Sequence, residues 1–160
     1  MIIIDNDAKK TYSKVIKHVE TLLPAYARYI PRRYKAYIKF CGNEEWGKRG
    51  IARGEGPKLV LADTGTIMPD GEVVNGFFWS SYDTNAIVLD ITNAAKFQKN
   101  PVKYEVALQY LLLHEMIHWA RFNAGLPAEV TAGMGLRKGE AGDEFEYEAY
   151  GHDVSYLWDR

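Results

Sequence analysis

The sequence predicts a single α+β domain over residues 1–160, and three observations along the chain support this prediction. The first third has helical periodicity. The middle has three short segments with the composition of β-strands, and an apolar stretch near residue 110 has the start and stop signals of a long helix. With 160 residues, of which 47% are hydrophobic, the chain is long enough to bury a core of its own.

The predicted helical part comes first. Residues 7–23 carry apolar side chains at spacings of three and four, which is typical of an amphipathic helix. Pro24 and Pro31 interrupt or restart the helical segments that are expected between residues 25 and 40. Residues 43–57 are polar, contain glycine and lack periodicity, so they are expected to form a loop.

The predicted strands follow this loop. Turn-forming residues separate three segments that are rich in β-branched and aromatic side chains. These segments are Lys58–Ala62, Gly76–Trp79 and Ala86–Ile91.

The predicted long helix begins at Asn100-Pro101, a favourable N-cap followed by a favourable first residue, and ends before Gly125. Apolar side chains lie around most of its circumference, so it is expected to be buried on most sides. His114, Glu115 and His118 stand within this apolar helix. Polar groups are costly to bury without partners, so these three residues conflict with their apolar surroundings. Such conflicts are typical of functional sites, and we expect the functional site of this protein at these residues.

Composition excludes several classes of protein. The single cysteine, Cys41, rules out an internal disulfide, and the net charge of −1 argues against a nucleic-acid-binding protein. No apolar run is long enough for a membrane span, and residues 1–5 lack the features of a classical signal peptide. Residues 1–60 carry 13 Lys and Arg against 6 Asp and Glu, which predicts either pairing with the acidic remainder or a basic docking surface.

The spacing of the two histidines predicts a metal site. Residues four apart lie on one helical face, so the imidazoles of His114 and His118 converge on one ion, for which Zn²⁺ is the expected metal. Glu115 lies beside the first ligand, where it acts as general base on a metal-bound water. The alternative is a pair of structural histidines in the core.

A catalytic zinc site needs a third protein ligand. Position 124 is alanine, so no histidine follows six residues after His118, and Cys41 lies far upstream. His152 remains an alternative, but the acidic stretch 140–150 is favoured. Its members with side-chain carboxylates are Glu140, Asp143, Glu144, Glu146 and Glu148.

Helical periodicity selects Glu146 from this stretch. Phe145, Ala149, His152 and Tyr156 form the packing stripe of an expected second helix, and Glu146, Tyr150 and Asp153 lie on the adjacent stripe. Glu146 is therefore expected as the third ligand, with Glu148 as the next candidate. Tyr150 is expected among the catalytic residues. A group that stabilises the oxyanion is also expected, and Tyr150, Tyr147, His152 and Tyr82 are the candidates for it.

These residues resemble a known family. Residues 114–119, 139–142 and 145–151 resemble the metallopeptidase toxin domains of bacterial polymorphic-toxin systems and type VI secretion effectors. Residues 145–149 are also similar to the helix that carries the third ligand in gluzincin peptidases, which implies zinc binding by Glu146. Some gluzincin families have an aspartate four residues after the ligand, whereas this chain has Tyr150 there.

The resemblance implies a zincin-like fold, with a small sheet, an active-site helix and a following helix that carries a glutamate. It also implies a zinc metallopeptidase that hydrolyses a peptide bond, with residues 76–91 as the edge to which an extended substrate adds. A secreted or injected toxin implies a larger delivery protein and an immunity protein. The alternatives are a zinc-binding regulatory or structural protein without turnover and an interaction domain that uses its basic N-terminal third.

Overall fold

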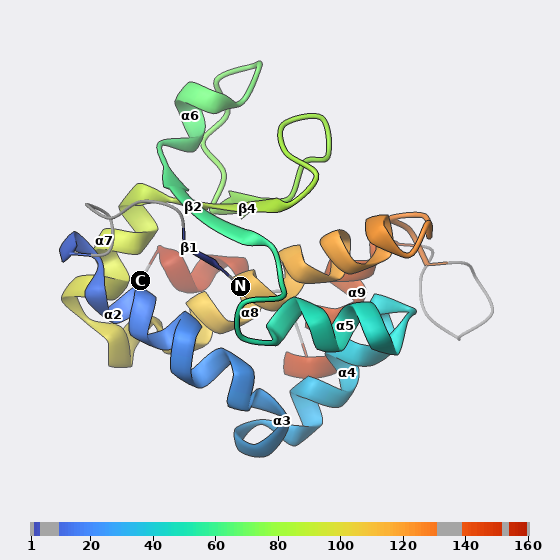
Figure 1. Ribbon diagram of the computed structural model, residues 1–160. Coiled ribbons are helices and arrows are strands. Elements are labelled where there is room, and N and C mark those ends of the chain that lie inside the picture. Colours follow the sequence, from blue (N-terminus) through green and yellow to red (C-terminus); the bar gives the residue numbers. More distant parts are fainter. Residues whose placement is uncertain (1, 4–9, 131–138, 152–153, 160) are drawn as a thin grey trace.

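Helix α8 (Pro101–Asn123) is the central element of the structure, a computed structural model that describes residues 2–3, 10–130, 139–151 and 154–159. Strands β3 (Gly76–Phe77) and β4 (Ala86–Asp90) contact it. Helices α4 (Pro31–Cys41), α5 (Glu44–Ile51), α7 (Ile91–Lys99) and α9 (Ala141–Tyr150) also contact it (Figure 1). Asn100 caps the helix by accepting a hydrogen bond from the Lys103 N–H, and Pro101 follows as its first residue. The predicted long helix is confirmed.

The sheet has four strands in the order β1-β2-β4-β3 within the described residues. The two inner strands, β2 (Lys58–Ala62) and β4 (Ala86–Asp90), are parallel, with Leu59 opposite Ile87. Strand β1 (Ile2–Ile3) pairs with β2 in parallel, and β3 (Gly76–Phe77) pairs with β4 in antiparallel fashion. The predicted α+β class is confirmed, and β3 forms an edge of the sheet.

The remaining helical elements surround this frame (Figure 1). They are α2 (Ser13–Lys17), η1 (His18–Leu22), η2 (Leu23–Ala25), α3 (Tyr26–Tyr29), α4 (Pro31–Cys41), α5 (Glu44–Ile51), α6 (Thr64–Ile67), α7 (Ile91–Lys99), α9 (Ala141–Tyr150) and η3 (Ser155–Trp158).

Helix α5 lies where the sequence predicted a loop, and that prediction was wrong. Asn43 caps the helix by accepting from the Trp46 N–H, and acidic and basic residues stand at the ends that the helix dipole favours. Gly47 and Gly50 obscure the periodicity because they replace apolar side chains on the buried face. A Cβ at Gly50 would lie 2.6 Å from the Tyr37 hydroxyl, so close packing requires glycine there.

The second predicted helix is shorter than expected. Helix α9 ends at Tyr150, where Gly151 adopts a left-handed conformation with φ of 85°. The predicted packing stripe therefore continues only as far as Ala149, and Tyr156 belongs to η3. His152 and Asp153 lie outside the described residues.

The buried side chains form one hydrophobic cluster around α8, in which Leu108, Leu112, Leu113 and Met116 are fully buried. His18 lies in this core with its ring against those of Tyr26 and Phe97. Burial lowers the pKa of His18 to about 4, so this histidine is neutral near pH 7.

Among the described helices, none combines the length and the apolar character needed to cross a membrane.

Candidate metal centre

Helix α8 brings His114, Glu115 and His118 together, as the sequence predicted. The two histidine rings are one helical turn apart, with centroids separated by 5.1 Å. Both histidine side chains keep 17% of their surface exposed, whereas Glu115 is buried. The helix therefore presents two accessible imidazoles and one protected carboxylate.

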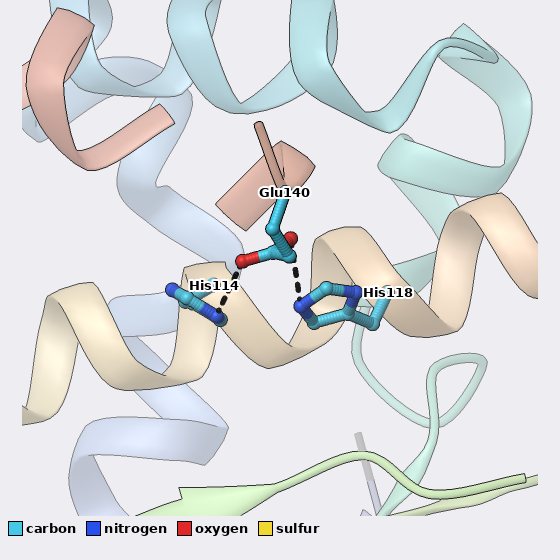
Figure 2. A group of neighbouring side chains, drawn as sticks. All are labelled: His114, His118 and Glu140. Atoms are coloured by element: carbon cyan, nitrogen blue, oxygen red, sulfur yellow. Dashed lines mark ion pairs between the residues drawn. The ribbon is translucent and has the colours of Figure 1, made fainter. Parts of the chain in front are cut away.

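Glu140 joins the two histidines. Its Oε2 lies 3.3 Å from the Nε2 of His114, and its Oε1 lies 3.0 Å from the Nε2 of His118. Figure 2 shows the carboxylate between the two rings, with a dashed line to each. The three side chains form a group of metal-ligating atoms that all lie within 4.8 Å of one another.

The spacing of these atoms fits a zinc ion. Zinc bonds of about 2.0–2.2 Å at tetrahedral angles place neighbouring ligand atoms roughly 3.3–3.5 Å apart. The distance from the His114 Nε2 to Oε2 of Glu140, 3.3 Å, and the distance from the His118 Nε2 to Oε1, 3.0 Å, each lie close to this separation. Two imidazoles and a carboxylate are also the donor set of many catalytic zinc sites.

The charges in this group perturb one another. Burial by itself disfavours the protonated form of His114, but its hydrogen bonds to Glu140 and Glu146 outweigh this effect and raise its pKa well above the usual value. Burial also disfavours the charged form of Glu140, but the two histidines hold the pKa of this carboxyl well below its usual range. The carboxylates of Glu140 and Glu146 therefore favour a positive charge at the His114 ring, and the two histidines favour the negative charge of Glu140.

The start of α9 holds Glu140 in this position. Its carboxylate caps the helix by accepting hydrogen bonds from the backbone N–H groups of Gly142 and Asp143. A short antiparallel bridge joins Glu140 to Glu129, with the Ala141 N–H donating to the Ala128 carbonyl at 3.0 Å. Glu140 is thus oriented by both the helix end and the neighbouring segment.

Arg121 supports that neighbouring segment. This buried side chain of α8 donates hydrogen bonds to the carbonyls of Phe40, Pro127 and Glu129, at 2.8, 2.6 and 3.2 Å. It thereby ties the segment that pairs with Glu140 to the helix that carries the histidines.

Gly142 allows α9 to approach His114. A Cβ at this position would lie 2.5–2.6 Å from three atoms of the His114 ring, which is closer than such atoms approach in proteins. Either the ring or the helix start would have to move. The absence of a side chain at Gly142 is therefore a condition for the contact of Glu140 with the histidines.

We expect Gly142→Ala to weaken metal binding by about ten-fold or more, in the range typical of changes behind the ligands. The added methyl group also costs about 1–3 kcal/mol of stability through overpacking. A zinc titration against a chromophoric chelator and thermal unfolding of the metal-free protein measure the two effects. Gly125→Ala is the control: its φ of 68° disfavours alanine, but nothing lies within 4 Å of the added methyl. Equal zinc affinity in Gly142→Ala and wild type would contradict this role.

Glu146 lies on the other side of His114. Its Oε1 is 2.7 Å from the Nδ1 of His114, and its Oε2 accepts from the Val154 N–H at 3.3 Å. With His114 and Asp143 it forms a second group of potential ligand atoms, but that group lacks His118. Glu146 as third ligand therefore stays a prediction, while the residue that contacts both Nε2 atoms is Glu140, the cap of α9.

The other acidic and catalytic candidates lie elsewhere. Glu148 is exposed and pairs with Lys39. The Tyr150 hydroxyl donates to Gln109 at 3.3 Å, and the Arg33 guanidinium lies 4.5 Å from its ring centre. Burial raises the pKa of Tyr150. The structure therefore gives Tyr150 a partner outside the group of His114, His118 and Glu140.

The structure also describes two other tyrosines considered for the oxyanion and the single cysteine considered as a metal ligand. Tyr147 is exposed on α9, and the ring of Tyr82 packs edge-on against Phe77 at 5.9 Å. Cys41 is fully buried, and burial raises its pKa to about 12, which disfavours the thiolate that binds metal.

Glu115 lies between two cavities. Its Oε2 accepts a hydrogen bond of 2.7 Å from the Phe78 N–H, which follows strand β3. Burial raises the pKa of Glu115, although the charges of His114 and His118 oppose this effect. A raised pKa suits a carboxylate that takes and returns a proton.

The first cavity, the His118-side cavity, has a volume of about 290 Å³. Its lining consists of Phe78, Trp79, Ser80, Glu115, His118, Arg121, Phe122, Leu126 and Ala128. The second, the His114-side cavity, has a volume of about 210 Å³. Its lining consists of Asn75, Gly76, Tyr110, Leu111, His114, Glu115, Asp143 and Glu146.

Comparison with known proteins identifies the family of this chain. No curated protein and no solved structure matches the chain significantly. A family model described as metallopeptidase toxin 3 matches residues 8–151, which include both histidines, Glu115 and Glu140. This match spans nearly the whole sequence, and the chain therefore belongs to the metallopeptidase toxin 3 family.

Proposed function

We propose that this protein is a zinc-dependent peptidase in which His114, His118 and Glu140 hold the metal and Glu115 is the general base. The observation that carries the assignment is the contact of one carboxylate with the Nε2 atoms of two histidines one helical turn apart. Family membership supports the reaction class. Glu140 thus replaces Glu146 as the proposed third ligand.

Zinc bound by these residues would polarise the scissile carbonyl and lower the pKa of a bound water toward about 7. Glu115 takes the proton of the attacking water and returns it to the leaving amine. The Phe78 N–H donates to Oε2 of Glu115 and so limits the rotation of the carboxylate. Burial keeps this base away from bulk water.

Glu146 has a positioning role in this proposal. A histidine that binds metal through Nε2 commonly donates from Nδ1 to a carboxylate, which orients the ring and raises its basicity. Glu146 lies 2.7 Å from the Nδ1 of His114. This contact uses one ring nitrogen and leaves the other, Nε2, available for metal. Its second oxygen is held by the Val154 N–H.

Strand β3 is the proposed platform for the substrate backbone. It lies at an edge of the sheet, with Gly76 at the His114-side cavity and the adjoining Phe78 at the His118-side cavity. A peptide that adds to this edge as a strand would pass Glu115 between the two cavities. The two cavities beside Glu115 would give a substrate access to the metal, which favours an enzyme over a closed structural zinc site.

Chelation tests the enzymatic assignment. Zinc-loaded protein is expected to cleave an unfolded protein substrate, to lose this activity in a strong chelator and to regain it when zinc is restored. Mass spectrometry of the products measures cleavage, and circular dichroism checks that the chain stays folded. Undiminished cleavage by protein shown to be free of metal would contradict the assignment.

The biological role in this proposal is that of a secreted or injected toxin, with a delivery protein and an immunity protein as partners. The family description supports the toxin role. Expression of wild type and Glu115→Gln in a bacterial host, with and without an added export signal, tests it. We expect growth inhibition only from the wild type and only in the compartment that contains the target. Equal growth of both variants in both compartments would contradict a toxic action on that host.

A further inference from the structure

The two cavities beside Glu115 differ in chemistry. Aromatic and aliphatic side chains dominate the His118-side cavity, whereas amide, phenol and carboxylate groups line much of the His114-side cavity. The larger volume belongs to the more apolar one, at about 290 against 210 Å³. The two flanks of a bound peptide would therefore meet different surroundings.

We propose that the His118-side cavity is a specificity pocket for a large apolar side chain, aromatic or long aliphatic, of the substrate. This inference rests on the proposed peptidase function and adds the class of substrate residue. The pocket shares Glu115 and His118 with the reacting centre, so its occupant lies next to the cleaved bond.

Aromatic surface in this pocket is available to a ligand. Trp79 is 37% exposed and Phe122 is 45% exposed, although both are large apolar side chains. The Phe122 ring packs against that of Phe78 with centroids 5.7 Å apart, which forms an aromatic wall. An apolar side chain that covers this wall removes apolar surface from water on both partners.

The one guanidinium in the pocket lining does not make it a site for an anionic side chain. Arg121 donates from Nε and both terminal nitrogens to the carbonyls of Pro127, Phe40 and Glu129. These hydrogen bonds hold the group against the main chain. Glu115 on the same lining further disfavours a negatively charged occupant.

The direction of β3 assigns the pocket to one side of the cleaved bond. From Gly76 to Phe78 the chain runs from the His114-side cavity to the His118-side cavity. Antiparallel pairing is the commoner arrangement of strands. A peptide added antiparallel to β3 runs the opposite way, so the pocket receives a residue on the N-terminal side of the cleaved bond.

Cleavage-site mapping tests this inference. Zinc-loaded wild-type protein is incubated with a proteome-derived peptide library, and mass spectrometry identifies the cleaved bonds. We expect Phe, Tyr, Trp, Leu and Met to be enriched by at least about five-fold N-terminal to the cleavage position, as expected when burial of a large apolar group decides the choice.

Binding provides a measurement independent of turnover. In a Glu115→Gln background, a fluorescent peptide with the preferred residue is expected to bind at least about ten-fold more tightly than its alanine version. Phe122→Ala in that background should reduce this ratio to about three-fold or less. Tyr29→Ala removes an aromatic side chain that is 60% exposed and lines neither cavity, so it should retain the full ratio.

The outcomes separate the two proposals. Cleavage without an apolar preference, a preference on the C-terminal side, or an unchanged ratio in Phe122→Ala would overturn the pocket assignment and leave the peptidase function standing. Absence of cleavage by zinc-loaded wild-type protein would overturn the peptidase function itself, and the pocket assignment with it.

Discussion

Glu115→Gln is expected to lower kcat by about 10²–10⁴-fold while the protein keeps its full complement of zinc, because this is the usual contribution of a general base. The amide retains the shape of the side chain and can still accept from the Phe78 N–H, which now donates to the carboxylate at 2.7 Å. It cannot take a proton from water. Steady-state cleavage of a peptide and elemental analysis of the same sample measure the two properties.

Glu115→Asp and Glu44→Gln are the controls for this substitution. The aspartate retains an ionisable group but shortens the side chain, so partial activity is expected. Glu44 is exposed and pairs with Lys48 of the same helix at 2.5 Å, so its substitution should leave both properties unchanged. Full activity in Glu115→Gln would exclude Glu115 as the base.

Glu140→Ser is expected to reduce zinc affinity by more than about 100-fold, beyond the 10–100-fold that is typical for groups behind the ligands. Serine is a favourable N-cap, so it preserves the cap of α9 that Glu140 now provides. Its hydroxyl is too short to replace the carboxylate between the two Nε2 atoms. Competition with a chelator of known affinity measures the change.

Glu146→Gln and Glu148→Gln complete this series. Glu146 contacts the Nδ1 of His114, so its substitution should weaken zinc binding by about 10–100-fold. Glu148 pairs with Lys39 at the surface, so its substitution should have no effect. Loss of zinc from Glu146→Gln together with retention in Glu140→Ser would exchange the roles of the two carboxylates.

Local sequence patterns predicted the elements that carry most of the site. The cap and apolar residues of α8 predicted that helix, and the spacing of His114 and His118 predicted that their rings would share one face. The three segments predicted as strands contain β2, β3 and β4, although β3 ends at Phe77 and not at Trp79, and Ile91 belongs to α7. These features depend on neighbouring residues, so periodicity and capping preferences were sufficient.

Helical periodicity did not select Glu140, the third ligand proposed above, because it considers only positions within a helix. Glu140 is the residue before α9, and its position depends on the bridge to Glu129 and on the absence of a side chain at Gly142. Glutamate is not among the preferred N-cap residues, so capping preferences did not mark Glu140 as the start of a helix. The small residues on either side of it, Gly139, Ala141 and Gly142, were the one sequence feature that favours a close approach of this segment to a neighbour.

Glycines also account for two errors in the predicted helices. Gly47 and Gly50 obscured the apolar face of α5, where their lack of a side chain permits packing against Ile38 and Tyr37. Gly151 ends α9 with a positive φ, whereas the predicted stripe continued beyond it. The packing of Gly47 and Gly50 involves residues of another helix, so the spacing of apolar residues within α5 could not predict it.

A crystal structure of the zinc-loaded protein, with anomalous diffraction data collected on both sides of the zinc absorption edge, would show which side chains bind the ion. We expect one zinc ion within about 2.0–2.2 Å of the Nε2 atoms of His114 and His118 and of a Glu140 oxygen. Glu146 should remain on the Nδ1 of His114. A zinc ion bound by Glu146 in place of Glu140, or bound without His118, would exclude the proposed set of ligands.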